Sequence, residues 1–326
     1  MKTNFKIILV ALVAFVSFST VSCSDDDDNT TPAVDNTITG IASRTANLSS
    51  LTAALNRAGL ASTLRGAGPF TVFAPTNAAF SSFLTANGYP NLEAVPVPAL
   101  KEILLNHVLN GRNLSTGIST GYVKTLGKGA ASTTNTLSMY ISKTGSAVRL
   151  NGVSNVTTPD VSASNGVVHI VDAVIGLPTI VTHAQANPDF STLVAALTYN
   201  PASGFVGVLS GTTNSPFTVF APTNDAFTNP TTGFLNEIGV TGLDGIAPAV
   251  LEKTLKYHVK TNGNVLAGSL SDGQVINMFS TQDVIVRTSP TRLRDVSNRD
   301  CNIINTDVQC SNGVIHVLSK VLLPTF

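Results

Sequence analysis

Hydrophobic residues near the start of the folded part of the chain recur at helical spacing. Leu48, Leu51, Leu55 and Ala58 fall on one face of a helix, and Gly59 follows them as a residue suited to ending it. The pattern therefore predicts a helix that ends at Gly59 and contributes one apolar face to a core.

A strand, a turn and a second helix are predicted next. Residues 70–74 are a short run of β-formers that Pro75 closes. Thr76 or Asn77 can cap a helix that begins at Ala78 and turns Phe80 inward.

Another strand is predicted after a tight turn. Asn165-Gly166 suits such a turn, and the β-branched run that follows predicts a strand over residues 167–175. The same pattern recurs from Asn312-Gly313 to Leu323. Mixed strands and helices of this kind indicate an α+β fold.

The chain contains two copies of this arrangement. Residues 69–77 recur without change at 216–224, and residues 165–171 recur in similar form at 312–318. Both pairs are displaced by 147 positions (216 minus 69 and 312 minus 165). A shared displacement indicates a duplicated domain, and it predicts a boundary near residues 177–178.

Length and charge narrow the class of protein. The chain has 326 residues, of which 43% are hydrophobic and 12% charged, enough for about two average domains. Its 19 basic and 19 acidic residues balance, so no strong positive field favours a nucleic-acid partner. The sequence therefore predicts a folded protein that does not bind nucleic acid.

The N-terminus predicts export and a lipid anchor. Lys2 and Lys6 precede an apolar stretch at 7–16 that is too short to span a membrane. Residues 20–23 then resemble the lipobox of bacterial lipoproteins, with Thr20 where that motif usually carries Leu. The resemblance implies a signal peptide over residues 1–23 and acylation of Cys23 by fatty acids such as palmitate. An ordinary signal peptide with an incidental Cys is the alternative.

An acidic, turn-rich segment follows over residues 24–35. It contains four consecutive Asp residues and cannot bury apolar surface, so we expect a flexible tether. The acidic run also resembles the export signal that sends some lipoproteins to the outer face of the outer membrane. The expected location is therefore the outer membrane, with the folded part exposed at the cell surface.

The repeated segments resemble the two signature boxes of the fasciclin (FAS1) family. The similarity covers residues 36–178 and 179–326, which we take as the two domains. It implies that each domain is a β-sandwich or wedge with packed helices. The residues matching the family motifs, to which we assign structural roles, are Thr71, Phe73, Pro75, Asn77, Gly166, His169, Thr218, Phe220, Pro222, Asn224, Gly313 and His316.

Between the two boxes, the family carries a Tyr-His pair that is linked to integrin recognition in its animal members. The second copy keeps the pair as Tyr257 and His258, whereas the first copy has Asn106 and His107. The resemblance makes these four residues candidates for binding a partner. A half-buried Tyr that covers the core is an equally good interpretation of Tyr257.

No pattern predicts catalysis, a metal site or a cofactor. Residues 117–121 match the nucleophile-elbow pattern around Ser119, and Asp160 and His169 follow in the order that α/β hydrolases use. The flanking residues predict neither the strand before Ser119 nor the helix after it, and the second copy lacks the pattern. We therefore interpret His169 and His316 as buried residues with satisfied hydrogen bonds.

Cys301 and Cys310 are the cysteines that remain beside Cys23. An even pair in an exported protein predicts a disulfide. The two residues would lie side by side if the chain reverses between them, near the positions equivalent to Thr158 and Pro159 of the first copy.

The expected function is adhesion or binding of an extracellular protein or polysaccharide, without catalysis. Residues 36–178 carry nine basic and four acidic residues (plus five), and residues 179–326 carry eight and ten (minus two). The first domain would therefore favour an anionic ligand. The alternatives are a carbohydrate-handling or hydrolytic accessory protein, and an architectural protein of the envelope.

Overall fold

The computed structural model describes residues 34–326 of the chain. The predicted signal peptide, Cys23 and most of the acidic tether lie outside the described residues. Within the described part, no helix has both the length and the apolar character that a membrane span needs.

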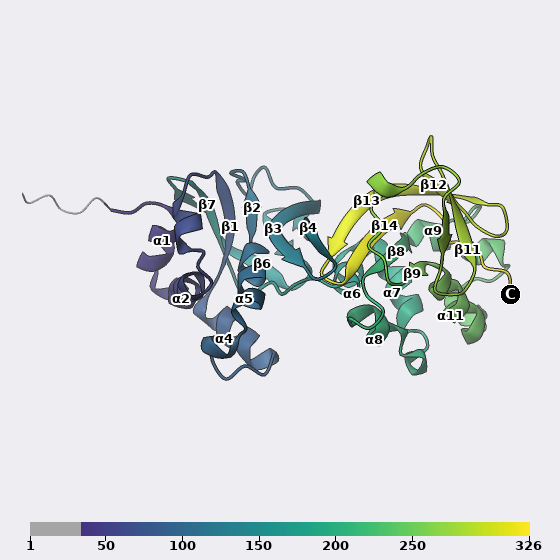
Figure 1. Ribbon diagram of the computed structural model, residues 1–326, viewed down its shortest axis with the longest axis horizontal. Coiled ribbons are helices and arrows are strands. Elements are labelled where there is room, and N and C mark those ends of the chain that lie inside the picture. The colour runs from purple at the N-terminus through teal and green to yellow at the C-terminus, as the bar shows by residue number, and fades with distance from the viewer. Residues whose placement is uncertain (1–33) are drawn as a thin grey trace, which may run out of the picture. The chain divides into compact units, whose positions relative to one another are not determined.

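The first domain places its helices mainly before its strands, as Figure 1 shows. Its helices are α1 (Ile38–Arg44), α2 (Ser49–Arg57), α3 (Ala61–Arg65), α4 (Asn77–Ala86) and α5 (Val97–Leu105), with 3-10 turns at Ala46–Leu48 and Leu92–Ala94. Its strands are β1 (Phe70–Pro75), β2 (Val108–Asn110), β3 (Gly121–Gly129), β4 (Ser132–Thr144), β5 (Ala147–Leu150), β6 (Ser154–Ala163) and β7 (Gly166–Val171).

The second domain repeats this plan. Its helices are α6 (Ile180–Ala186), α7 (Ser191–Thr198), α8 (Phe205–Ser210), α9 (Asn224–Thr228), α10 (Phe234–Glu237) and α11 (Pro248–Tyr257), with 3-10 turns at Pro188–Phe190, Pro201–Ser203, Leu243–Gly245 and Ala267–Ser269. Its strands are β8 (Phe217–Pro222), β9 (Val259–Lys260), β10 (Val275–Asn277), β11 (Asp283–Arg287), β12 (Arg292–Arg294), β13 (Asp300–Cys310) and β14 (Gly313–Leu318).

Each domain is built on a seven-stranded sheet, with the strand orders β2-β1-β7-β6-β5-β4-β3 and β10-β11-β12-β13-β14-β8-β9. The duplicated boxes form the parallel pairs, β1 with β7 and β8 with β14, which are the second and third strands from one edge of each sheet. The other neighbours described in the two sheets are antiparallel. The α+β prediction is confirmed.

The strands β1 and β8 are buried on both faces, because each domain packs one core on either side of its sheet. In β1, Val72 and Ala74 belong to the core shared with the helices, whereas Phe73 belongs to the core on the other face. Residues 219–221 of β8 alternate in the same way. This alternation follows from the period of two along a strand.

Three predicted boundaries differ from the structure. Helix α4 begins at Asn77, because the hydroxyl of Thr76 accepts a hydrogen bond from the N–H of Ala79 and acts as the N-cap. Strand β7 ends at Val171 instead of residue 175, and β14 ends at Leu318 instead of residue 323. In both domains the chain leaves the sheet where pairing with the neighbouring strand ends.

Candidate functional site

The motif residues of the first domain hold its segments together from inside. Thr71 donates its hydroxyl proton to the carbonyl of Gly111 (2.7 Å) and accepts from the N–H of Asn113 (2.8 Å). Asn77 accepts from the N–H of Ser50 (2.9 Å), which joins the start of α4 to α2. These polar side chains are therefore used within the domain.

The second domain repeats the same bonds. Thr218 donates to the carbonyl of Gly263 (2.7 Å) and accepts from the N–H of Val265 (2.9 Å). Asn224 accepts from the N–H of Thr192 (2.8 Å), as Asn77 does from Ser50. The two sequence boxes therefore encode one structural device that is used twice.

His169 is part of this device. The ring is fully buried and stacked on Phe73, with centroids 5.4 Å apart. Its Nδ1 accepts from the N–H of Asp160 (3.2 Å), and its Nε2 lies 2.9 Å from the carbonyl of Asn113, to which the neutral ring donates. Both ring nitrogens are thus occupied.

His316 is equivalent to His169 in the second domain. It stacks on Phe220 at 5.5 Å, accepts from the N–H of Asp307 (3.4 Å) and lies 2.8 Å from the carbonyl of Val265. Burial lowers its pKa below the ordinary value, which favours the neutral ring.

Gly166 and Gly313 allow the close approach of the parallel strands. A Cβ atom on Gly166 would lie 2.0 Å from the carbonyl oxygen of Phe70, and one on Gly313 would lie 2.2 Å from that of Phe217. No side chain fits at either position without moving the neighbouring strand.

The candidate partner-binding residues lie in the interior. Asn106 and Tyr257 are fully buried, and His107 and His258 are 2% and 3% exposed. The prediction that these four residues offer a surface to a partner is therefore at odds with the structure. The prediction was based on their position between the two family motifs, and that position does not show whether a side chain is exposed.

Each of the two His residues joins its helix to the segment after the last strand of its domain. His107 Nδ1 lies 2.8 Å from the carbonyl of Ile103, and its Nε2 accepts from the N–H of Ile175 (2.9 Å). His258 makes the equivalent bonds to Thr254 (2.8 Å) and Leu322 (2.8 Å). Burial lowers the pKa of both rings to about 4.

Asn106 and Tyr257, which precede these His residues, add further hydrogen bonds within each domain, but to different partners. The amide of Asn106 donates to the carbonyl of Gly176 (3.0 Å). The hydroxyl of Tyr257 donates to the carbonyl of Asp283 (2.7 Å) and accepts from the N–H of Val296 (3.1 Å). Burial raises the pKa of Tyr257. The difference between the copies is therefore a difference in internal bonding.

The arrangement that a hydrolase needs is not assembled around Ser119. The carboxylate of Asp160 accepts from the N–H and the hydroxyl of Ser115 (2.8 and 2.5 Å), not from Ser119. His169 has no free nitrogen for a general base. Ser119 lines a hollow of about 350 Å³ with Asn113 and other residues of the first domain.

The predicted disulfide is wrong. Cys301 and Cys310 are free and buried, because β13 continues through the expected reversal as a strand with register shifts. Nine residues of strand span roughly 30 Å, whereas a disulfide needs Cα atoms within about 7 Å. Burial raises the pKa of Cys301 to about 12 and that of Cys310 further.

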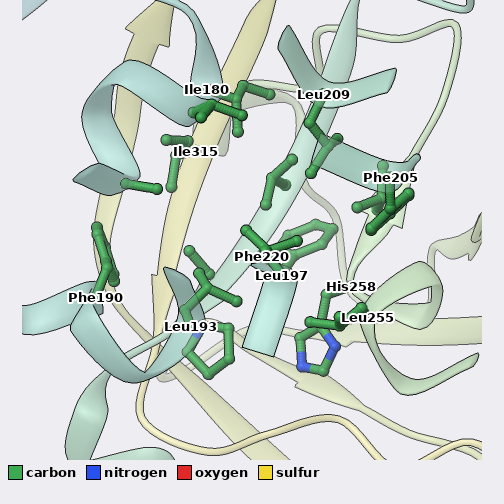
Figure 2. A pocket seen from close by; sticks show the side chains of 16 residues that line it. Ile180, Phe190, Leu193, Leu197, Phe205, Leu209, Phe220, Leu255, His258 and Ile315 are labelled. Carbon is green, nitrogen blue, oxygen red and sulfur yellow. The ribbon is translucent and has the colours of Figure 1, made fainter. Parts of the chain in front are cut away.

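An apolar cavity of about 20 Å³ lies in the core of the second domain. Figure 2 shows the aliphatic and aromatic side chains that converge on it, with the ring of His258 at one end. Because both nitrogens of His258 are already bonded, the ring offers the cavity no free polar group. A space of this size and character stays dry, so it is a packing defect and not a ligand site.

No group of three or more His, Cys, Asp or Glu residues in the described range is placed to hold a metal ion. His183 of α6 is fully buried, with its ring edge-on to Tyr122 of the first domain at 5.4 Å, and neither of its ring nitrogens has a partner among the described residues. Burial lowers its pKa to about 3, so it stays neutral.

A second hollow has a volume of about 390 Å³. It lies beside helix α4, the turn at 151–153, the segment 173–178 and Thr182 of α6. Sequence reasoning missed this place. Asn151-Gly152 signals a tight turn, but no pattern shows where the amide of Asn151 points.

Comparison with known proteins agrees with the duplicated architecture. The model of the fasciclin domain matches residues 46–178 and 188–324. The chain belongs to the fasciclin domain family. The fold is similar to that of a FAS1 domain pair from the insect cell adhesion molecule fasciclin I, with a TM-score of 0.50 at 21% identity over 85% of this chain and 97% of that one.

Two relatives illustrate the range of this fasciclin family. The Synechocystis protein sll1483 is 36% identical over 149 residues, which are 45% of this chain and 73% of that protein. Human periostin is 27% identical over 264 residues, which are 80% of this chain but 29% of periostin. The chain therefore spans less than a third of the length of periostin.

Proposed function

We propose that this protein is a lipid-anchored binding module of the bacterial cell surface that holds an extracellular partner without changing it chemically. One observation carries the non-catalytic part of the proposal. His107, His169, His258 and His316 each have both ring nitrogens in hydrogen bonds within the domains. Side chains that are fully engaged inside a fold are poor candidates for proton transfer.

Binding must then use the outer surface of the domains. The Tyr-His positions are buried, so an adhesive surface lies elsewhere in this protein. Family membership supports an extracellular role, because the similar domain pair comes from a cell adhesion molecule. The partner is an extracellular protein or polysaccharide.

The anchor belongs to the same proposal. The motif ending at Cys23 and the acidic run after it support acylation and display on the outer membrane. Metabolic labelling with a fatty acid, followed by protease treatment of intact cells, tests both features. We expect labelled, protease-accessible protein from the native sequence, and unlabelled protein from Cys23→Ala.

Adhesion is tested on the same cells. Cells that display the native protein should attach to surfaces coated with extracellular matrix proteins or polysaccharides. Cells expressing Cys23→Ala should attach no better than cells that lack the protein. Equal attachment of all three would contradict the proposal.

A further inference from the structure

The hollow beside α4 presents a mixed but uncharged lining. Along α4 it is lined by Ala79, Ser82, Phe83, Ala86 and Asn87, which recur at helical spacing. The facing wall is formed by the turn at 151–153, the segment 173–178 and Thr182 of α6. Its volume of about 390 Å³ falls within the range of roughly 300–1,000 Å³ that is usual for small-molecule sites.

Asn151 lines this hollow and carries an unused hydrogen-bond donor. The side-chain oxygen of Asn151 accepts from the N–H of Tyr140 (2.7 Å), and the backbone N–H of Asn151 donates to the carbonyl of Tyr140 (2.8 Å). These two bonds fix which way the amide faces. The residue is 2% exposed, and its Nδ2 has no acceptor among the described residues.

An enclosed donor without a partner costs free energy. Such groups are rare in folded proteins, because the donor has lost its hydrogen bonds to water and gained none in return. A ligand oxygen seated against Asn151 would supply the acceptor that the protein does not provide.

The other polar groups of the hollow complement this donor. Asn87 uses its amide nitrogen to donate to the carbonyl of Phe83 (2.8 Å), which leaves its side-chain oxygen available as an acceptor. Ser82 is exposed and can donate or accept. None of the residues that line the hollow carries a charge, so nothing there attracts an ion.

Apolar surface completes the lining. Phe83 is half-buried on α4, and Val153 is 52% exposed at the opposite wall. A ligand that fits must therefore combine hydroxyl groups, which both donate and accept, with an uncharged face of C–H groups.

The geometry points to a binding site for a neutral sugar residue of an extracellular polysaccharide. This inference rests on the proposed function and names its ligand class. One hydroxyl oxygen of the sugar accepts from Asn151, another hydroxyl donates to Asn87, and the C–H face packs against Phe83.

A peptide chain fits the hollow less well, because it needs a row of free backbone partners. In the wall formed by residues 173–178, several backbone groups are already hydrogen-bonded within the protein. The N–H of Ile175 donates to His107, and the carbonyl of Gly176 accepts from Asn106.

The second domain lacks the matching helix face. Helix α9 ends at Thr228 after five residues, whereas α4 runs for ten. Pro230 stands at the position of Phe83 (83 plus 147). The site is therefore built from the first domain, with Thr182 of α6 at its edge, and has no counterpart in the second, so one sugar residue binds per chain.

The test uses the full chain and panels of neutral gluco-, manno-, galacto- and xylo-oligosaccharides, with uncharged peptides in parallel, measured by calorimetry. We expect saturable binding of at least one oligosaccharide at one site per chain. Ser82→Trp, which fills the hollow from an exposed helix position, should weaken that binding at least tenfold. Ser81→Trp, on the neighbouring exposed position outside the lining, should leave it unchanged.

Asn151→Asp replaces the donor by an acceptor and should also weaken binding at least tenfold; circular dichroism checks that the variant folds. Binding of no oligosaccharide, equal binding by Ser82→Trp and the native chain, or binding of peptides in place of sugars would each overturn the inference. Attachment of cells to matrix surfaces separates the two claims. If attachment persists while sugar binding fails, the proposed function stands and only the sugar site is lost.

Discussion

His107 accepts a hydrogen bond from the backbone N–H of Ile175 at 2.9 Å, 68 residues further along the chain. The bond joins the end of α5 to the segment that leaves β7, and His258 repeats it with Leu322 in the second domain. A position that resembles a recognition element in the family thus serves as an internal junction in both domains.

Replacement of His107 should therefore destabilise the first domain. His107→Ala leaves the N–H of Ile175 and the carbonyl of Ile103 without partners and opens a cavity, so we expect a loss of about 3 kcal/mol in the free energy of unfolding. Urea titration monitored by circular dichroism measures the loss. Lys101→Ala, on the exposed side of α5, should change stability by less than about 0.5 kcal/mol. A His107→Ala protein of native stability that no longer binds its partner would favour the recognition role instead.

Stability should fall as the pH drops below 6.5. Burial lowers the pKa of His107 and His258 from 6.5 to about 4, so below pH 6.5 the unfolded chain binds protons that the folded chain excludes. Each ring then removes about 1.4 kcal/mol of stability per pH unit until about pH 4. Above pH 6.5 the contribution of these rings is constant.

Comparing the pH dependence of stability of the native chain with that of His107→Ala separates the effect of the His107 ring from the titration of carboxylates. The free energy of unfolding of the native chain should fall more steeply between pH 6.5 and 4 than that of His107→Ala. The same slope in both proteins would contradict the burial of a neutral ring.

The two buried thiols should be free. Cys301 and Cys310 lie far apart along β13, so both should react with a thiol reagent in denaturant without any reductant. In the native state both should react slowly, because burial raises their pKa values and limits access. If neither cysteine reacts until a reductant is added, the two form a disulfide and this account of β13 is wrong.

Gly166 should tolerate no side chain. Gly166→Ala places a Cβ against the carbonyl of Phe70, and we expect a loss of more than about 2 kcal/mol in the free energy of unfolding. Gly207 provides the control, since it lies in α8 with nothing within 4 Å of its Cβ position. Gly207→Ala should be neutral or slightly stabilising. Similar melting temperatures for the two variants would show that the strands can separate.

Much of the fold can be predicted from the sequence because the domain is duplicated, and the comparison of the two copies shows which segments form equivalent elements. The displacement of 147 residues aligns β1 with β8 and β7 with β14, and the two copies obey one pattern of apolar positions. Strand ends were less predictable. Ile175 continues the β-branched pattern, yet its N–H bonds to the His107 ring instead of to a strand.

The candidate site could not be predicted in the same way, because burial of a polar residue depends on distant partners. The sequence leaves both interpretations of Tyr257 open, and the choice depends on Asp283 and Val296, which lie against its hydroxyl. Cys301 and Cys310 look paired until their strand proves continuous. The free amide of Asn151 appears only when the neighbouring strand is in place.

The most direct test of the account is whether this protein binds an extracellular partner and leaves it intact. The full chain is titrated against arrays of polysaccharides and matrix proteins, and every ligand that binds is recovered and its mass measured. The account predicts saturable binding and a ligand of unchanged mass. A ligand that is cleaved or modified by the protein would contradict it.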